Sequence, residues 1–146
     1  MIARAANRTL TLGVLQTSYG SNLADNILRT ADLVRAAAAK GAQVILPSEL
    51  FQGPYFCVTQ EERWFATALP WREHPCVTAM ASLAAELGVV IPVSIFERDG
   101  TEYYNSLVMI DADGSPLGVY RKSHICLLYT SPSPRDRTRS RMPSSA

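Results

Sequence analysis

The chain has 146 residues, 47% of them hydrophobic, which suffices for one domain whose core needs no disulfide or metal. Four of its 14 Lys and Arg residues, but only one acid, lie in residues 126–146, so the remainder offers no basic face for nucleic acid. No run approaches the roughly 18 apolar residues of a membrane helix, and the amino terminus lacks the apolar region of a secretory signal.

Cysteine usage points to a reducing compartment. Cys57, Cys76 and Cys126 are odd in number and form no CxxC pair, and only His74 and His124 are available to join them as metal ligands. We therefore expect a cytoplasmic protein with no disulfide framework, no metal and no cofactor.

The first elements alternate between strand and helix. Residues 10–18 are apolar on both alternating sets, which predicts a strand covered on both faces. Residues 22–40 repeat apolar positions at spacings of three and four, which predicts a helix. Residues 44–46 form a short buried strand that Pro47 ends, because proline cannot donate to the ladder. Glu49 consequently lies just past the carboxyl end of that strand.

Two helices are expected next. Thr59 and Glu62 have the spacing of a capping box, which predicts a short helix towards Thr67. Pro75 suits the first position of a longer helix that closes at Gly88.

The period then changes to two. Residues 89–97 and 102–110 flank the hairpin dipeptide Asp99–Gly100, and Asp113–Gly114 turns the chain into a further strand over residues 115–122. The order of elements predicts an α/β domain that ends in a three-stranded meander.

After Ile125 this patterning stops. Residues 126–146 are rich in Ser, Pro and Arg and poor in large apolar groups, so we expect a disordered tail. It has three interpretations: a phosphorylated or nucleic-acid-binding tail, disorder without function, or translated adapter DNA that is not natural coding sequence. We favour the last, because the change falls within a motif. The predicted organisation is an extension over residues 1–9, a domain over 10–125 and this tail.

Two charged residues invite a catalytic interpretation. Glu49 and Lys122 both lie at ends of predicted strands, and ligands of α/β sheets usually bind outside the carboxyl ends of strands. A carboxylate and an ammonium there can form an ion pair in which both groups stay charged. From spacing alone, a solvated loop glutamate and a strand-edge lysine that discourages aggregation are the preferred explanation of the two residues.

Four stretches together carry a family resemblance: "LTLGVLQTS", "VILPSELFQGPYF", "ELGVVIPVSIFER" and "YYNSLVMIDADGSPLGVYRKSHI". Over residues 10–125 the chain resembles the nitrilase (carbon-nitrogen hydrolase) superfamily, and within it most closely the N-carbamoylputrescine amidase family. The resemblance implies the amino-terminal part of an α-β-β-α sandwich. It also implies a small-molecule carbamoyl or amide substrate, no nucleic acid or membrane partner, and a homo-oligomer when the enzyme is complete.

The resemblance further implies a Glu-Lys-Cys mechanism. Glu49 corresponds to the general base and Lys122 to the lysine that stabilises the oxyanion. The nucleophilic cysteine of the family lies downstream of the lysine motif, so we expect it to be absent from this chain and the chain itself to be inactive. Cys57 is expected in a loop and Cys76 in the core, while Cys126 stands where the sequence departs from the family pattern.

Five polar or aromatic residues near these motifs are assigned supporting roles. His124 resembles a structural companion of the lysine, and Asn105 and Ser106 resemble residues that support the sheet end beneath it. Tyr55 and Phe56 either line a pocket or cover the core.

Alternatives remain open. The chain is also compatible with a β-ureidopropionase, an N-carbamoyl amino acid amidase or another aliphatic amidase, and with a non-catalytic fragment that pairs with a full-length homologue.

Overall fold

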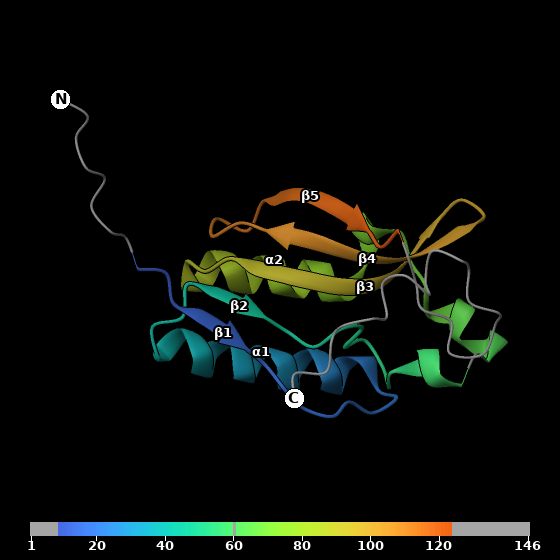
Figure 1. The fold of residues 1–146 in the computed structure, drawn as a ribbon, viewed down its shortest axis with the longest axis horizontal. Coiled ribbons are helices and arrows are strands. Elements are labelled where there is room, and N and C mark those ends of the chain that lie inside the picture. Colours follow the sequence, from blue (N-terminus) through green and yellow to red (C-terminus); the bar gives the residue numbers. More distant parts are fainter. Residues whose placement is uncertain (1–8, 60, 124–146) are drawn as a thin grey trace, which may run out of the picture.

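The computed structural model describes residues 9–59 and 61–123, which form two α-helices and five strands in an α/β arrangement (Figure 1). The strands are β1 (Leu12–Val14), β2 (Val44–Leu46), β3 (Ile91–Asp99), β4 (Glu102–Ile110) and β5 (Pro116–Arg121). The helices are α1 (Leu23–Ala39) and α2 (Pro75–Leu87). Short 3₁₀ helices occupy Phe56–Val58, Glu62–Thr67 and Trp71–Glu73. The predicted residues His124 and Cys126, and the tail over residues 126–146, lie outside the described residues.

The strands form two sheets, β1–β2 and β3–β4–β5, which a backbone bridge joins in chain order. β1 pairs with β2 in parallel, and β3, β4 and β5 form the predicted antiparallel meander. A parallel bridge between Val44 and Val90 joins the two groups, and the Ile45 N–H donates to the Val90 carbonyl over 2.9 Å. The carboxyl ends of β2 and β5 are thereby brought to the same region of the sheet.

Both helices cover one face of this sheet. Val34 from α1 and Met80 from α2 are fully buried against Ile45, Val93 and Val108 from three strands. Figure 1 shows α1 running beside β1 and β2, and α2 lying behind β3. Within the described ranges, no helix is long and apolar enough to cross a membrane.

The opposite face of β1 and β2 is uncovered in the described part of the chain. Leu12 is 65% exposed and Val14 75% exposed, and Leu46 beside them on β2 is 40% exposed. The sequence predicted a strand covered on both faces, and this prediction is wrong for the described residues. Both alternating sets are apolar, but only the set of Gly13 and Leu15 meets the helices.

The short helix towards Thr67 is present, but the predicted capping box is wrong. The Glu62–Thr67 helix is a 3₁₀ helix whose cap, Glu61, makes no side-chain capping bond. The Thr59 hydroxyl instead donates to the Phe56 carbonyl over 3.1 Å, so it closes the preceding turn. The helix from Pro75 is confirmed, and its cap Gly88 has the left-handed φ of 65° that favours glycine.

A buried polar network ties the loop after β2 to the start of α2. His74 caps α2 by accepting the Cys76 N–H at Nδ1 over 3.3 Å, while its Nε2 lies 3.2 Å from the Gln52 side-chain oxygen. The same oxygen accepts the Phe96 N–H over 2.7 Å, which identifies it as the amide oxygen of Gln52. Because an amide oxygen can only accept, Nε2 of His74 must carry the ring proton and donate to it. The imidazole is therefore neutral, and its burial lowers its pKa from 6.5 to about 4.

This histidine makes stability dependent on pH. Because the folded pKa is the lower one, the unfolded chain binds the proton more readily. The stabilising contribution is therefore complete above pH 6.5 and is lost as the pH falls towards 4. Between pH 7 and pH 5 we expect His74 to account for a loss of about 2 kcal/mol in the free energy of unfolding. Denaturant unfolding measures this loss at both pH values in the chain made soluble by Leu12→Lys and Val14→Lys, with and without His74→Gln. An equal loss in both proteins would contradict the assignment.

Candidate active site

Glu49 occupies a turn that is fixed on both sides. Pro47 ends β2, and the Ser48 hydroxyl donates to the Leu15 carbonyl over 3.2 Å. Leu50 has a φ of 53°, a left-handed conformation that is strained for a residue with a branched side chain. It is held there because its side chain is buried and its N–H donates to the Ser94 hydroxyl over 3.1 Å. The turn therefore presents the Glu49 carboxylate at the open face of the sheet.

Lys122 reaches the same place from the end of β5. Its N–H donates to the Asn105 carbonyl over 2.9 Å, which extends the pairing of β5 with β4 by one residue. Its Nζ donates to Glu49 Oε1 over 3.2 Å, and both side chains are about 40% exposed. The structure thus brings together the two residues, 73 positions apart, that were predicted as base and oxyanion lysine.

Two further groups hold the Glu49 carboxylate. The Asn105 side-chain amide donates to Oε1 over 2.6 Å, and the Tyr55 hydroxyl donates to Oε2 over 3.5 Å. Asn105 was expected only to support the sheet end, so its direct contact with Glu49 was missed. The alternation of side chains along the strands was the available signal, since Asn105 within β4 lies opposite Lys122, one residue past the last pair of β4 with β5.

Ser106 lies on the other face of β4 and has no part in this cluster. It is buried and donates to Glu97 on the helix-covered side of the sheet. Of the expected sheet-end pair, only Asn105 contacts the candidate base.

The charges around Glu49 favour its ionised form. Partial burial alone would raise its pKa, but the hydrogen bond from Asn105, the hydrogen bond and charge of Lys122, and the bond from Tyr55 together lower it. The pKa of Tyr55 rises to about 12, because the hydroxyl is partly desolvated and faces this carboxylate. Glu49 is consequently a carboxylate at neutral pH and can accept a proton.

The two cysteines in the described part of the chain are poorly suited to nucleophilic attack. Cys57 is half-buried, and desolvation together with the nearby Glu49 raises the pKa of its thiol. Cys76 is fully buried in α2, and burial raises its pKa to about 12. Both thiols therefore stay protonated at neutral pH.

Phe56 belongs to an aromatic cluster beside the site. Its ring lies 5.6 Å from that of Trp64 and 5.0 Å from that of Phe96. Phe56 and Trp64 line a mostly apolar cavity of about 250 Å³, whose lining includes neither Glu49 nor Lys122. The predicted pocket-lining role therefore fits Phe56, whereas Tyr55 contacts the candidate base itself. Among residues 9–59 and 61–123, no group of three or more His, Cys, Asp or Glu gathers as a metal site.

Comparison with known proteins supports the predicted family. A family model described as "Carbon-nitrogen hydrolase" matches residues 11–145. An N-carbamoylputrescine amidase of Arabidopsis thaliana is 48% identical over 125 residues, which is 86% of this chain and 42% of the relative. A citrullinase of Francisella tularensis is 44% identical over 114 residues, 78% of this chain and 40% of the relative.

A solved structure gives the same result for the fold. The crystal structure of a carbon-nitrogen hydrolase from Helicobacter pylori G27 matches with a TM-score of 0.73 and 32% identity, over 80% of this chain and 40% of that one. The chain spans about two fifths of the length of these relatives. Its fold is the corresponding portion of the nitrilase fold, as the resemblance implied. The chain belongs to the carbon-nitrogen hydrolase family.

Proposed function

We propose that this chain is the amino-terminal part of an amidase that hydrolyses the terminal ureido group of N-carbamoylputrescine. We call the protein encoded by the continued reading frame the complete enzyme. The observation that carries the proposal is the ionised Glu49 carboxylate held by Asn105 and Lys122 at 2.6 and 3.2 Å. A proton acceptor beside a fixed cation is what cysteine-dependent acyl transfer requires.

Glu49 acts as the general base of this reaction. It accepts the thiol proton of a nucleophilic cysteine that the complete enzyme supplies from outside this chain. The resulting thiolate attacks the ureido carbonyl, Glu49 gives the proton to a nitrogen, and this nitrogen leaves as ammonia or amine. Glu49 then takes a proton from water, which attacks the thioester carbonyl, and returns it to the sulfur, so that the cysteine leaves as thiol.

Lys122 stabilises the negative oxygen of the tetrahedral intermediates. Its ammonium donates to the carbonyl oxygen as charge develops there, and such a donor contributes most where substrate excludes water. The protonated thiols of Cys57 and Cys76 support a nucleophile outside this chain, and we expect the chain alone to have no hydrolase activity.

The ureido group is favoured by the relatives. N-carbamoylputrescine and citrulline both carry a terminal ureido group on an alkyl chain with an amine, and relatives named for each are 48% and 44% identical to this chain. Citrulline is therefore the second candidate substrate. A β-ureidopropionase, which would require a carboxylate in place of the free amine, is the third.

The test begins with the gene. Sequencing across codon 125 establishes the downstream frame, and the complete enzyme is then assayed for ammonia release from N-carbamoylputrescine, citrulline and N-carbamoyl-β-alanine. We expect turnover of N-carbamoylputrescine with the highest kcat/KM. Preference for N-carbamoyl-β-alanine would refute the polyamine assignment.

The same sequencing separates an enzyme from a binding protein. If the codons for residues 126–146 are confirmed in the genome and end at a stop, the non-catalytic fragment becomes the better interpretation. That fragment would then co-purify with a full-length homologue.

A further inference from the structure

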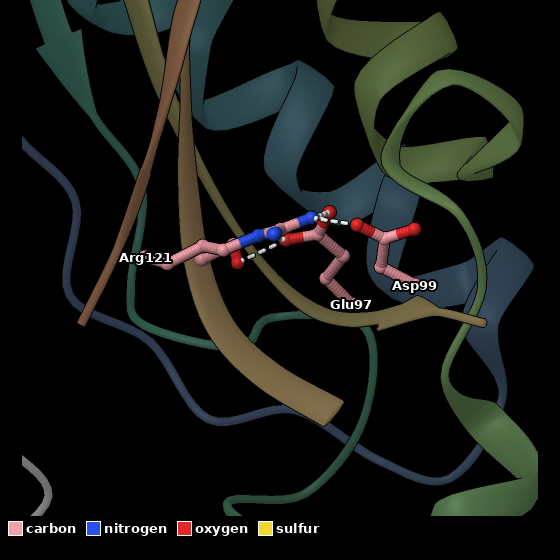
Figure 2. A network of polar contacts seen from close by, with 4 residues as sticks. Glu97, Asp99 and Arg121 are labelled. Carbon is pink, nitrogen blue, oxygen red and sulfur yellow. Dashed lines mark hydrogen bonds and ion pairs between the residues drawn. The ribbon is translucent and has the colours of Figure 1, made fainter. Parts of the chain in front are cut away.

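A second charged cluster lies on the face of the sheet opposite to that of Lys122. Figure 2 shows its residues Glu97, Asp99 and Arg121. Arg121 donates from Nε to Glu97 Oε2 over 2.9 Å and from Nη2 to Glu97 Oε1 over 2.7 Å. Nη2 also donates to Asp99 over 2.6 Å. The guanidinium therefore joins the end of β5 to β3, two strands away across the sheet.

Glu97 depends on this contact. Its side chain is 1% exposed, and burial alone would raise its pKa, but hydrogen bonds from Arg121 and Ser106 hold the pKa below its ordinary value. Ser106 lies directly opposite Arg121 on β4, and the Tyr104 ring stacks 4.1 Å from the guanidinium. An arginine that is bidentate to a buried carboxylate and stacked on an aromatic ring has one well-defined geometry.

The neighbouring lysine has no such support. Arg121 is the last residue of β5 and Lys122 the next, so the pleat directs their side chains to opposite faces. In the described part of the chain β5 pairs only with β4, and the Lys122 N–H makes the last bond of that ladder. The half-exposed Lys122–Glu49 pair is of the kind that contributes little by itself.

We propose that the Glu97–Arg121 pair is a positioning device, which anchors the end of β5 so that the Lys122 ammonium stays at Glu49. The proposal rests on the proposed function and adds to it a residue pair on the far side of the sheet. Arg121 touches no substrate and acts through the backbone it shares with Lys122. Loss of the anchor frees the strand end, and a displacement of about 1 Å suffices to impair catalysis strongly.

The central experiment is Arg121→Met in the complete enzyme. We expect kcat to fall about 100-fold while KM changes little, because the oxyanion donor moves and the substrate site remains. We also expect the acidic limb of the kcat/KM profile to shift to higher pH, because Glu49 loses part of the charge that lowers its pKa. Unchanged kcat and an unchanged acidic limb would overturn the proposal.

Two single variants serve as matched controls. Arg35→Met removes another bidentate arginine–glutamate pair, Arg35–Glu86 at 2.7 and 3.1 Å, which joins α1 to α2 on an exposed surface away from β5. Asp99→Asn removes only the charge of the exposed carboxylate that Arg121 also contacts. Both should keep kcat within about twofold, and a 100-fold loss in either would contradict the assignment to the Glu97–Arg121 pair.

A double variant separates positioning from folding. Arg121→Met leaves the Glu97 carboxylate buried without its cation and lowers the melting temperature. Glu97→Gln combined with Arg121→Met removes that charge and keeps an acceptor for Ser106, so the melting temperature should recover while kcat stays low. Recovery of kcat together with the melting temperature would show a structural role only and overturn the proposal.

Lys122→Met in the same enzyme separates this inference from the proposed function. If Lys122→Met is inactive and Arg121→Met retains full kcat, the positioning role fails and the proposed mechanism stands. If Lys122→Met retains full kcat, the lysine has no part in the reaction, and the proposed mechanism and the positioning role fail together.

Discussion

Glu49→Gln in the complete enzyme should lower kcat by about 10³-fold, within the range that general acid–base catalysis contributes. Glutamine preserves the shape of the side chain, and its oxygen can still accept from Asn105, but the amide cannot take a proton from a thiol or from water. Steady-state ammonia release measures the loss. Substrate binding should be retained, so KM is expected to change by less than about tenfold.

Glu86→Gln is the matched control for this substitution. Glu86 is also an exposed carboxylate paired with a cation, at 2.7 Å from Arg35, but it lies on α2 far from the carboxyl ends of β2 and β5. Its substitution should leave kcat unchanged. If Glu49→Gln keeps more than about a tenth of wild-type kcat, Glu49 is not the general base.

Expressed by itself, the 146-residue chain should be largely insoluble. Leu12 and Val14 are 65% and 75% exposed on the uncovered face of β1, which is an edge strand in the described part of the chain, and exposed apolar edge strands associate with other chains. Leu12→Lys combined with Val14→Lys should raise the soluble fraction several-fold, because charged side chains on such a strand oppose edge-to-edge pairing. Soluble and pelleted protein after lysis give the measurement.

Leu28→Lys controls for added charge. Leu28 is 65% exposed but lies on α1, outside the sheet face, so this variant should remain as insoluble as the wild type. A wild-type chain that is monomeric and melts cooperatively would contradict the prediction.

The elements whose signals are local could be predicted from the sequence. The β2 strand has the bounds Val44–Leu46 that Pro47 and the apolar run indicated, and α2 begins at Pro75 and ends before Gly88 as predicted. Proline and glycine restrict the backbone at their own positions, so their effect needs no knowledge of distant residues. The first strand was predicted over residues 10–18 but spans only Leu12–Val14, because an apolar run does not show which of its residues pair with a neighbouring strand.

The site could be predicted only in part. Glu49 and Lys122 came from a family resemblance, and their ion pair agrees with the expected roles without testing them. The contacts of Gln52 with the Phe96 N–H and of Arg121 with Glu97 were missed, because they join residues 44 and 24 positions apart. Such contacts depend on strand register, which the hydrophobic pattern alone does not specify for polar residues.

The bulge at Met109/Ile110 has a consequence for engineering this chain. Pairing passes from Ile110 with Pro116 to Met109 with Gly118, so Leu117 is the extra residue on β5. Downstream of the bulge, Arg121 and Lys122 reach opposite faces of the sheet only because successive side chains of a strand alternate between its two faces. Inserting or deleting one residue between Gly118 and Arg121 would turn the arginine to the face of Glu49 and the lysine to the face of Glu97. A change of two residues would keep each cation on its own face but displace it by about 7 Å along the strand, so the length of this part of β5 is fixed.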